Sequence, residues 1–190
     1  MKDIIISKLN KAYEGTAVLK DFSTRISGNG ITCIMGPSGC GKTTLMNILL
    51  GLEKADSGEI SGLPDRVSAV FQEDRLCEDF SASANIRMAC SRSLPDEEIQ
   101  KWLDHLEIPE ILHKKTSELS GGMKRRVAIA RAMLAEGDMI FMDEPFKGLD
   151  DETRKAVIRE VKACGKPLLI ITHDPEDAEL LGANIIYFNT

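Results

Sequence analysis

The stretch GPSGCGKTT, Gly36 to Thr44, decides the fold of this chain. It fits the phosphate-binding pattern G-x-x-x-x-G-K-[ST] at every constrained position. The apolar run Ile31 to Met35 before it predicts a buried strand, and the amphipathic run Thr44 to Leu50 after it predicts a helix. A strand, a glycine-rich loop and a helix in this order predict a phosphate-binding loop, the P-loop.

The charge of a polyphosphate explains these residue types, because several negative charges need many short donors that converge from one side. Glycines at three positions let the backbone turn its N–H groups inward, and the first turn of the helix adds unpaired N–H groups and the positive end of its dipole. A glycine-rich turn without a ligand is the weaker alternative. The expected nucleotide contacts are Gly36, Pro37, Ser38, Gly39, Cys40, Gly41, Lys42, Thr43 and Thr44.

Three side chains of the loop have separate expected tasks. Lys42 reaches the β- and γ-phosphates as a point charge and so acts in catalysis as well as in binding. The Thr43 hydroxyl ligates Mg²⁺. Thr44 contacts the α-phosphate.

Length, charge and cysteine content limit the classes of protein. The chain has 190 residues, enough for one well-buried domain with a small subdomain. Its net charge of −6 argues against a nucleic-acid surface, which needs concentrated Lys and Arg. Five cysteines without a C-x-x-C pair indicate reduced thiols in a cytosolic protein. Apolar runs are too short for a signal peptide or a membrane span, so we expect a partner to provide any membrane contact.

Hydrophobic patterns predict an α/β fold. Short β-type runs up to the P-loop, Ile4 to Leu9, Val18 to Ile26 and Ile31 to Met35, predict an antiparallel patch that leads into the loop. Arg66 to Gln72 predicts another strand, whereas residues 73–118 carry helix signals only. Beyond residue 118, helices and strands alternate, which predicts a mainly parallel sheet covered on both faces.

The predicted organisation is one domain over residues 1–190. Its catalytic core consists of residues 1–72 and 119–190, and a helical subdomain of residues 73–118 is inserted between them and continues into the next helix. The later elements are expected as a helix to about Glu136, a strand at Met139 to Met142, a helix at Asp151 to Cys164, a strand at Leu168 to Thr172, a short helix after Pro175 and a strand at Ile185 to Phe188.

A second chemical centre follows the strand at Met139 to Met142. Asp143 and Glu144 stand at its carboxyl end, the edge at which open α/β sheets bind ligands. Asp143 can hold Mg²⁺ beside the P-loop, usually through water. Glu144 can polarise an attacking water molecule. The alternative is that these two carboxylates are only a solvated strand end. This alternative is the weaker one, because a P-loop needs a carboxylate partner of this kind.

The motif LSGGM, Leu119 to Met123, gives the chain a specific resemblance. Alone it could be a helix N-terminus with Ser120 as its cap. Here it stands between a P-loop and an Asp-Glu strand, and the whole chain resembles the nucleotide-binding subunit of an ATP-binding cassette (ABC) transporter. The resemblance implies a P-loop NTPase core, ATPase activity, and ATP and Mg²⁺ as ligands.

The resemblance assigns further residues to the nucleotide site. Tyr13 matches the aromatic residue that stacks on adenine. Gln72 matches the glutamine that contacts the metal and links it to the membrane partner. His173, in LIITHD, matches the switch histidine that contacts the γ-phosphate.

The resemblance also implies an ATP-dependent dimer, either of two copies or with a related cassette. The signature residues Ser120, Gly121 and Gly122 match those that touch the γ-phosphate of ATP bound to the opposite subunit. Asp150, in KGLD, matches the loop that crosses the dimer interface. We therefore expect each site to be completed by the second subunit.

The implied partner is a transmembrane permease, which would place the chain in the cytoplasm on the inner face of the membrane. Met123 in place of the commoner glutamine resembles importers of the nitrate, sulfonate and taurine type, while Glu78-Asp79-Phe80 departs from that group and leaves the substrate open. Phe71, Leu76 and Phe80 are candidates for a groove that receives a permease helix. The alternatives are an ATP-driven clamp on DNA or ribosomes, and a small-molecule kinase.

Overall fold

The computed structural model describes residues 1–188, which form two sheets and six α-helices. The antiparallel sheet has the order β2-β1-β4, with β1 Ile4–Tyr13, β2 Thr16–Ile26 and β4 Ser57–Ser61. The second sheet has the order β5-β6-β7-β3-β8, with β3 Ile31–Met35, β5 Val67–Val70, β6 Met139–Asp143, β7 Leu168–Ile171 and β8 Asn184–Tyr187. All of its neighbouring strands run parallel.

The helices follow the strands in the order that the sequence predicts. They are α1 Lys42–Leu49, α2 Ala82–Arg87, α3 Asp96–His105, α4 Gly121–Leu134, α5 Asp151–Ala163 and α6 Pro175–Leu181, with 3-10 turns at Pro109–Ile111 and Thr116–Glu118. None of these helices is long and apolar enough to cross a membrane.

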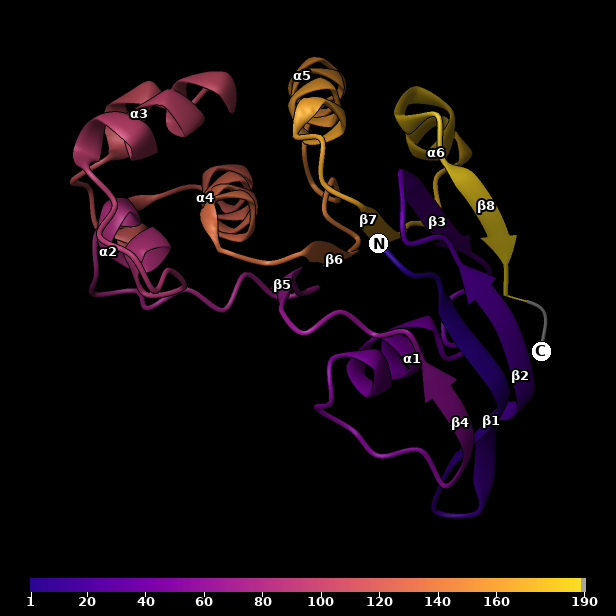
Figure 1. Ribbon diagram of the computed structural model, residues 1–190. Helices are drawn as coiled ribbons and strands as arrows, with labels where there is room; N and C mark the ends of the chain where they lie inside the picture. Colours follow the sequence, from indigo (N-terminus) through magenta and orange to yellow (C-terminus); the bar gives the residue numbers. More distant parts are fainter. Residues whose placement is uncertain (189–190) are drawn as a thin grey trace.

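The parallel sheet separates two apolar cores. Helix α1 lies between this sheet and the antiparallel sheet, while α4, α5 and α6 cover the opposite face (Figure 1). Successive side chains of a strand point to opposite faces, so each buried strand serves both cores. The buried strand residues on the face with α4 and α5 are Cys33, Met35, Val70, Ile140, Met142, Leu168 and Ile170. Those on the face with α1 are Ile34, Met139, Phe141, Leu169 and Ile171.

The α/β fold with a parallel sheet and an N-terminal antiparallel patch is confirmed. Some expectations were wrong. Ile31 to Met35, expected with the antiparallel patch, forms β3 of the parallel sheet, because it pairs with β7 and β8. The strand predicted at Arg66 to Gln72 ends at Val70, because its pairing with β6 stops there, so Gln72 lies in the following loop. The helix after the P-loop begins at Lys42 instead of Thr44, because Gly41 takes the N-cap position.

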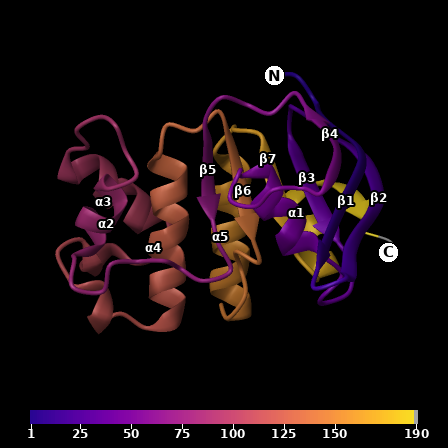
Figure 2. The same cartoon turned by 90° about the horizontal axis from the view of Figure 1, so that it is seen from below.

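The interval of residues 73–118 contains α2, α3 and the two 3-10 turns, and its only extended pairing is an isolated bridge between Ser81 and Lys115. Helices α2 and α3 pack on α4 at one end of the molecule, away from the antiparallel sheet (Figure 2). The division into a catalytic core and a helical subdomain stays a prediction.

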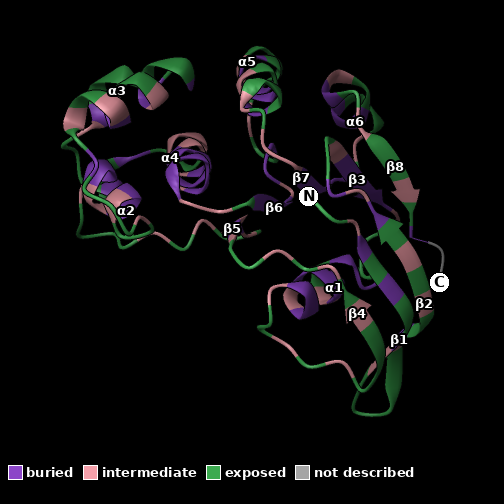
Figure 3. Cartoon of the chain, viewed as in Figure 1, coloured by how far each residue is buried: buried purple, intermediate pink, exposed green. Residues whose placement is uncertain are grey.

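Helix α4 is buried around most of its circumference (Figure 3). Its residues Val127, Ala128, Ile129 and Ala130 are each 0% exposed, because α2 and α3 cover one side and β5 covers another. Helix α4 is therefore the element that joins the helical interval to the sheet.

Candidate active site

The P-loop connects β3 to α1 through backbone conformations that require glycine. Gly41 has a φ of 108°, and a Cβ there would lie 2.8 Å from Cγ1 of Val18. A Cβ on Gly36 would lie 2.9 Å from the carbonyl oxygen of Phe188. Steric fit thus fixes both glycines independently of any ligand.

The Lys42 side chain lies within the loop. Its ammonium donates to the carbonyl oxygens of Gly36 at 2.8 Å and Pro37 at 2.7 Å, and lies 3.7 Å from the Cys40 sulfur. The residue is only 8% exposed. The positive charge is thus held inside the loop, where a phosphate group can take over its hydrogen bonds.

The P-loop and the Asp-Glu strand meet at one hydrogen bond. The Thr43 hydroxyl on α1 donates to Oδ2 of Asp143 on β6 at 2.7 Å, across 100 residues of sequence. Burial raises the pKa of Asp143, while the hydrogen bond from Thr43 opposes this shift. A hydroxyl and a carboxylate are the hard oxygen ligands that Mg²⁺ prefers, and a bound cation would offset the cost of burying this carboxylate. The donor set therefore fits Mg²⁺.

A pocket of about 510 Å³ opens beside this contact. Thr43, Gln72 and Asp143, the three predicted metal contacts, all line it. Lys147 and Arg125 line it as well, and sequence reasoning missed both. Lys147 lies between Glu144 and Asp150 in the sequence, and this position could have indicated that it lies near the site. Arg125 had no such signal, because its surroundings come from a distant loop.

Glu144 and His173 are in direct contact. Nδ1 of His173 lies 2.9 Å from Oε1 and 2.8 Å from Oε2 of Glu144. An ionised carboxylate only accepts hydrogen bonds, so the imidazole donates from Nδ1 and leaves Nε2 available to a ligand. Glu144 has a φ of 49°, and its backbone N–H donates to the carbonyl oxygen of Ile171 on β7. Backbone strain at this position is typical of functional sites.

Lys42, Glu144, His173 and the remaining predicted site residues do not line the pocket. Tyr13 ends β1, is 42% exposed and has the Lys11 ammonium 5.1 Å from its ring centre. Ser120 caps α4 by accepting from the N–H of Met123, and Asp150 caps α5 by accepting from the N–H of Thr153. The capping role considered for Ser120 is thus present. Gly121 and Gly122 form the first turn of α4.

Comparisons with known sequences give one consistent family. The family model described as ABC transporter matches residues 19–147, more than half of the chain. The taurine import ATP-binding protein TauB of Pelagibacter ubique is 34% identical over 206 residues, covering 97% of this chain and 78% of that protein. TauB of Roseobacter denitrificans is 38% identical, with 98% and 77% covered. The spermidine/putrescine import ATP-binding protein PotA of Legionella pneumophila is 34% identical, with 98% and 56% covered.

Solved structures agree with these sequence matches. A dimeric structure of a post-hydrolysis state of the ATP-binding cassette MJ0796, bound to ADP and Pi, superposes with a TM-score of 0.83 at 27% identity, covering 97% of this chain and 93% of that one. A bacterial Atm1-family ABC exporter with ATP bound shares the fold, with a TM-score of 0.86 at 19% identity, covering 99% of this chain and 37% of that one.

Proposed function

The chain belongs to the ABC transporter family and is an ATPase, and we propose that it is the ATP-binding subunit that powers import through a separate membrane permease. The contact between Thr43 and Asp143, with Glu144 directly beyond it, carries the ATPase part of the proposal, and the similarity to import ATP-binding proteins supports the coupling to import. The permease would hold the chain at the cytoplasmic face of the membrane. Substrate uptake tests this function: cells without the chain should lose uptake, and the wild-type chain should restore it where the Glu144→Gln variant does not.

Each residue has a task in hydrolysis. Lys42 and the backbone N–H groups of the P-loop bind the phosphates. Thr43, Asp143 and Gln72 would hold Mg²⁺, which when bound offsets charge on the phosphates. Glu144 orients and polarises the attacking water. His173, oriented by its hydrogen bond to Glu144, presents Nε2 to the γ-phosphate.

The site is completed by a second subunit. Ser120, Gly121 and Asp150 are exposed and so accessible to a second subunit, which supports contacts with ATP on the opposite subunit. The dimeric MJ0796 structure supports the same arrangement. The TauB and PotA relatives are import ATP-binding proteins, so the alternatives of a clamp on DNA or ribosomes and of a kinase have no support among them.

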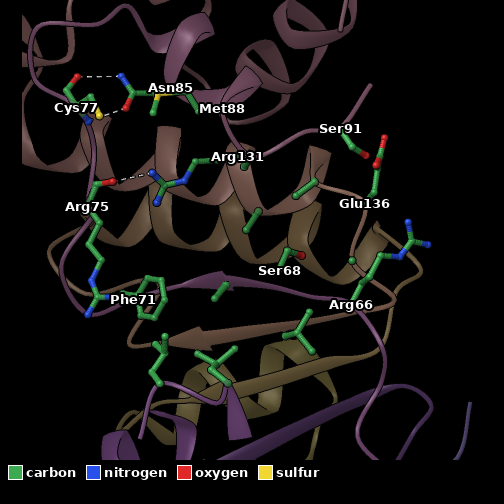
Figure 4. Close-up of a pocket in the computed structure, with 18 residues that line it drawn as sticks. Arg66, Ser68, Phe71, Arg75, Cys77, Asn85, Met88, Ser91, Arg131 and Glu136 are labelled. Atoms are coloured by element: carbon green, nitrogen blue, oxygen red, sulfur yellow. Dashed lines mark hydrogen bonds between the residues drawn. The ribbon is translucent and has the colours of Figure 1, made fainter. Parts of the chain in front are cut away.

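The proposed permease site is a groove of about 580 Å³ between the core and the helical interval (Figure 4). Phe71 lines it, as the sequence predicts. Leu76 packs against the buried core instead, and Phe80 is 49% exposed outside the groove, so neither lines it. The exposed apolar lining comes from Leu52 and Met88, which are 58% and 62% exposed. A short amphipathic helix of the permease fits this lining.

Met88→Asp is expected to weaken permease binding by at least about thirtyfold, the loss that defines a hot-spot residue at the centre of an interface. ATPase activity and thermal stability of the isolated chain should stay unchanged, because Met88 is mostly exposed. Co-purification with permeases encoded in neighbouring reading frames measures the binding. Leu63→Asp, an exposed leucine outside the groove, is the control. Undiminished permease binding by Met88→Asp would show that the helix docks elsewhere.

A further inference from the structure

The loop of residues 71–75, here called the linker loop, forms a wall shared by two pockets. Phe71 and Arg75 line both the active-site pocket and the groove. Gln72 and Glu73 line only the active-site pocket. A displacement of this loop therefore changes the groove and the metal site together.

Two arginines of α4 hold the linker loop by its backbone. The Arg125 guanidinium donates to the carbonyl oxygens of Phe71, at 2.7 Å, and Gln72. The Arg131 guanidinium donates to those of Asp74 and Arg75, both at 2.8 Å; the contact with Arg75 is drawn in Figure 4. The sheet ladder ends at Val70, so these carbonyls receive from α4 the hydrogen bonds that a strand partner no longer supplies.

Arg125 makes a third contact with the same loop. Its Nε forms an ion pair with Asp74, 3.2 Å from an Oδ1 that has no hydrogen-bond partner among the described residues, and Arg125 is only 8% exposed. Burial raises the pKa of Asp74, and the charge of Arg125 opposes this shift. Two carbonyls and one carboxylate thus converge on one guanidinium. The planar fork of the guanidinium holds both carbonyls in fixed directions beside the carboxylate, which the compact ammonium of a lysine does not do.

We propose that Arg125 is a positioning residue that places Gln72 at the metal site and couples it to the signature helix. This rests on the proposed role of Gln72 toward Mg²⁺. Ser120 caps the N-terminus of α4, and Arg125 stands in the second turn of the same helix. A movement of α4 therefore carries Ser120 and Gln72 together, and an occupant of the groove that shifts the linker loop acts on both.

Arg125→Lys tests the assignment, because lysine keeps the charge beside Asp74 and loses the fork that holds both carbonyls. We expect the Mg²⁺ concentration for half-maximal ATPase activity to rise about tenfold and kcat to fall about tenfold, as for lost support of a metal ligand. Binding of a fluorescent ATP analogue without Mg²⁺ should change by less than about twofold, because no phosphate contact is removed. Thermal unfolding of each variant verifies that it is folded.

The matched control is Arg126→Lys, the same substitution at the adjacent residue. The Arg126 guanidinium holds the carbonyl oxygens of Gly122, Leu106 and Glu107, none of them in the linker loop. Its half-saturating Mg²⁺ concentration should stay within about twofold of wild type. An equal rise in both variants would mean that any loosened arginine on α4 disturbs the site, and would overturn the specific role of Arg125.

A double-mutant cycle asks whether Arg125 acts through Gln72. Gln72→Ala should itself raise the half-saturating Mg²⁺ concentration, and adding Arg125→Lys to it should raise that value by less than about twofold. The coupling is contradicted if the double variant needs a further tenfold more Mg²⁺ than Gln72→Ala. It is also contradicted if Arg125→Lys alone does not raise the half-saturating Mg²⁺ concentration. An unchanged value in Gln72→Ala instead overturns the proposed metal role of Gln72, so the two failures are distinguishable.

Discussion

Replacement of Glu144 by glutamine is expected to slow ATP hydrolysis by about 10²- to 10⁴-fold, the range of general-base catalysis. Glutamine keeps the size of the side chain and an oxygen that can accept from Nδ1 of His173, so the contact at 2.8 Å can persist. It removes the negative charge that polarises the attacking water. ATP binding should be retained, because the contacts of Lys42 and the P-loop with phosphate are untouched.

The expected product of this substitution is a dimer that holds ATP. Gel filtration with ATP should show a species of twice the monomer mass, and phosphate release should measure the slowed turnover. Glu152→Gln, at an exposed position in the first turn of α5, makes the same chemical change away from the site and should turn over normally. Unchanged turnover in Glu144→Gln would remove Glu144 from its assigned role.

Replacement of Lys42 by alanine is expected to weaken ATP binding by about 10- to 100-fold, since one hydrogen bond to a charged group contributes about 1.5–3 kcal/mol. The ammonium is already held in the loop at 2.8 Å from the carbonyl oxygen of Gly36. The Lys42 side chain therefore loses little conformational entropy when ATP binds to the wild-type site. The substitution removes a phosphate contact that is made in the bound ground state as well as in the transition state. Affinity as well as turnover should therefore fall.

Titration with a fluorescent ATP analogue separates this effect from that of Glu144→Gln, which should change turnover alone. Lys20→Ala, an exposed lysine on β2, is the matched control and should bind as wild type does. Equal affinities of Lys42→Ala and wild type would contradict a phosphate contact by Lys42.

The fold could be predicted from the sequence wherever local pattern is enough. The strand before Gly36 and the strand before Asp143 are continuous apolar runs because both of their faces are buried, and the structure places them as β3 and β6. The order of the strands in the sheet is not local information. Thus the sequence could place Thr43 and Asp143 at one edge, but only the structure shows that they touch.

Other parts of the site had no sequence signal. An arginine on an amphipathic helix is usually solvated, whereas Arg125 is buried because carbonyls 53 and 54 residues away converge on it. Leu76 was expected in the groove because it is apolar and near Gln72, yet the backbone directs it into the core. Both cases depend on the path of the linker loop, which carries no periodic pattern.

The central claim is that each ATP site is shared between two subunits, and mixing two inactive variants tests it most directly. Lys42→Ala lacks an intact P-loop, and Ser120→Arg lacks an intact signature. A mixed dimer contains one composite site in which both are intact. The account predicts that the mixture regains part of the wild-type ATP hydrolysis while each variant alone stays inactive. A mixture as inactive as its components, together with wild-type turnover per chain that does not change with concentration in a strictly monomeric sample, would contradict the shared site.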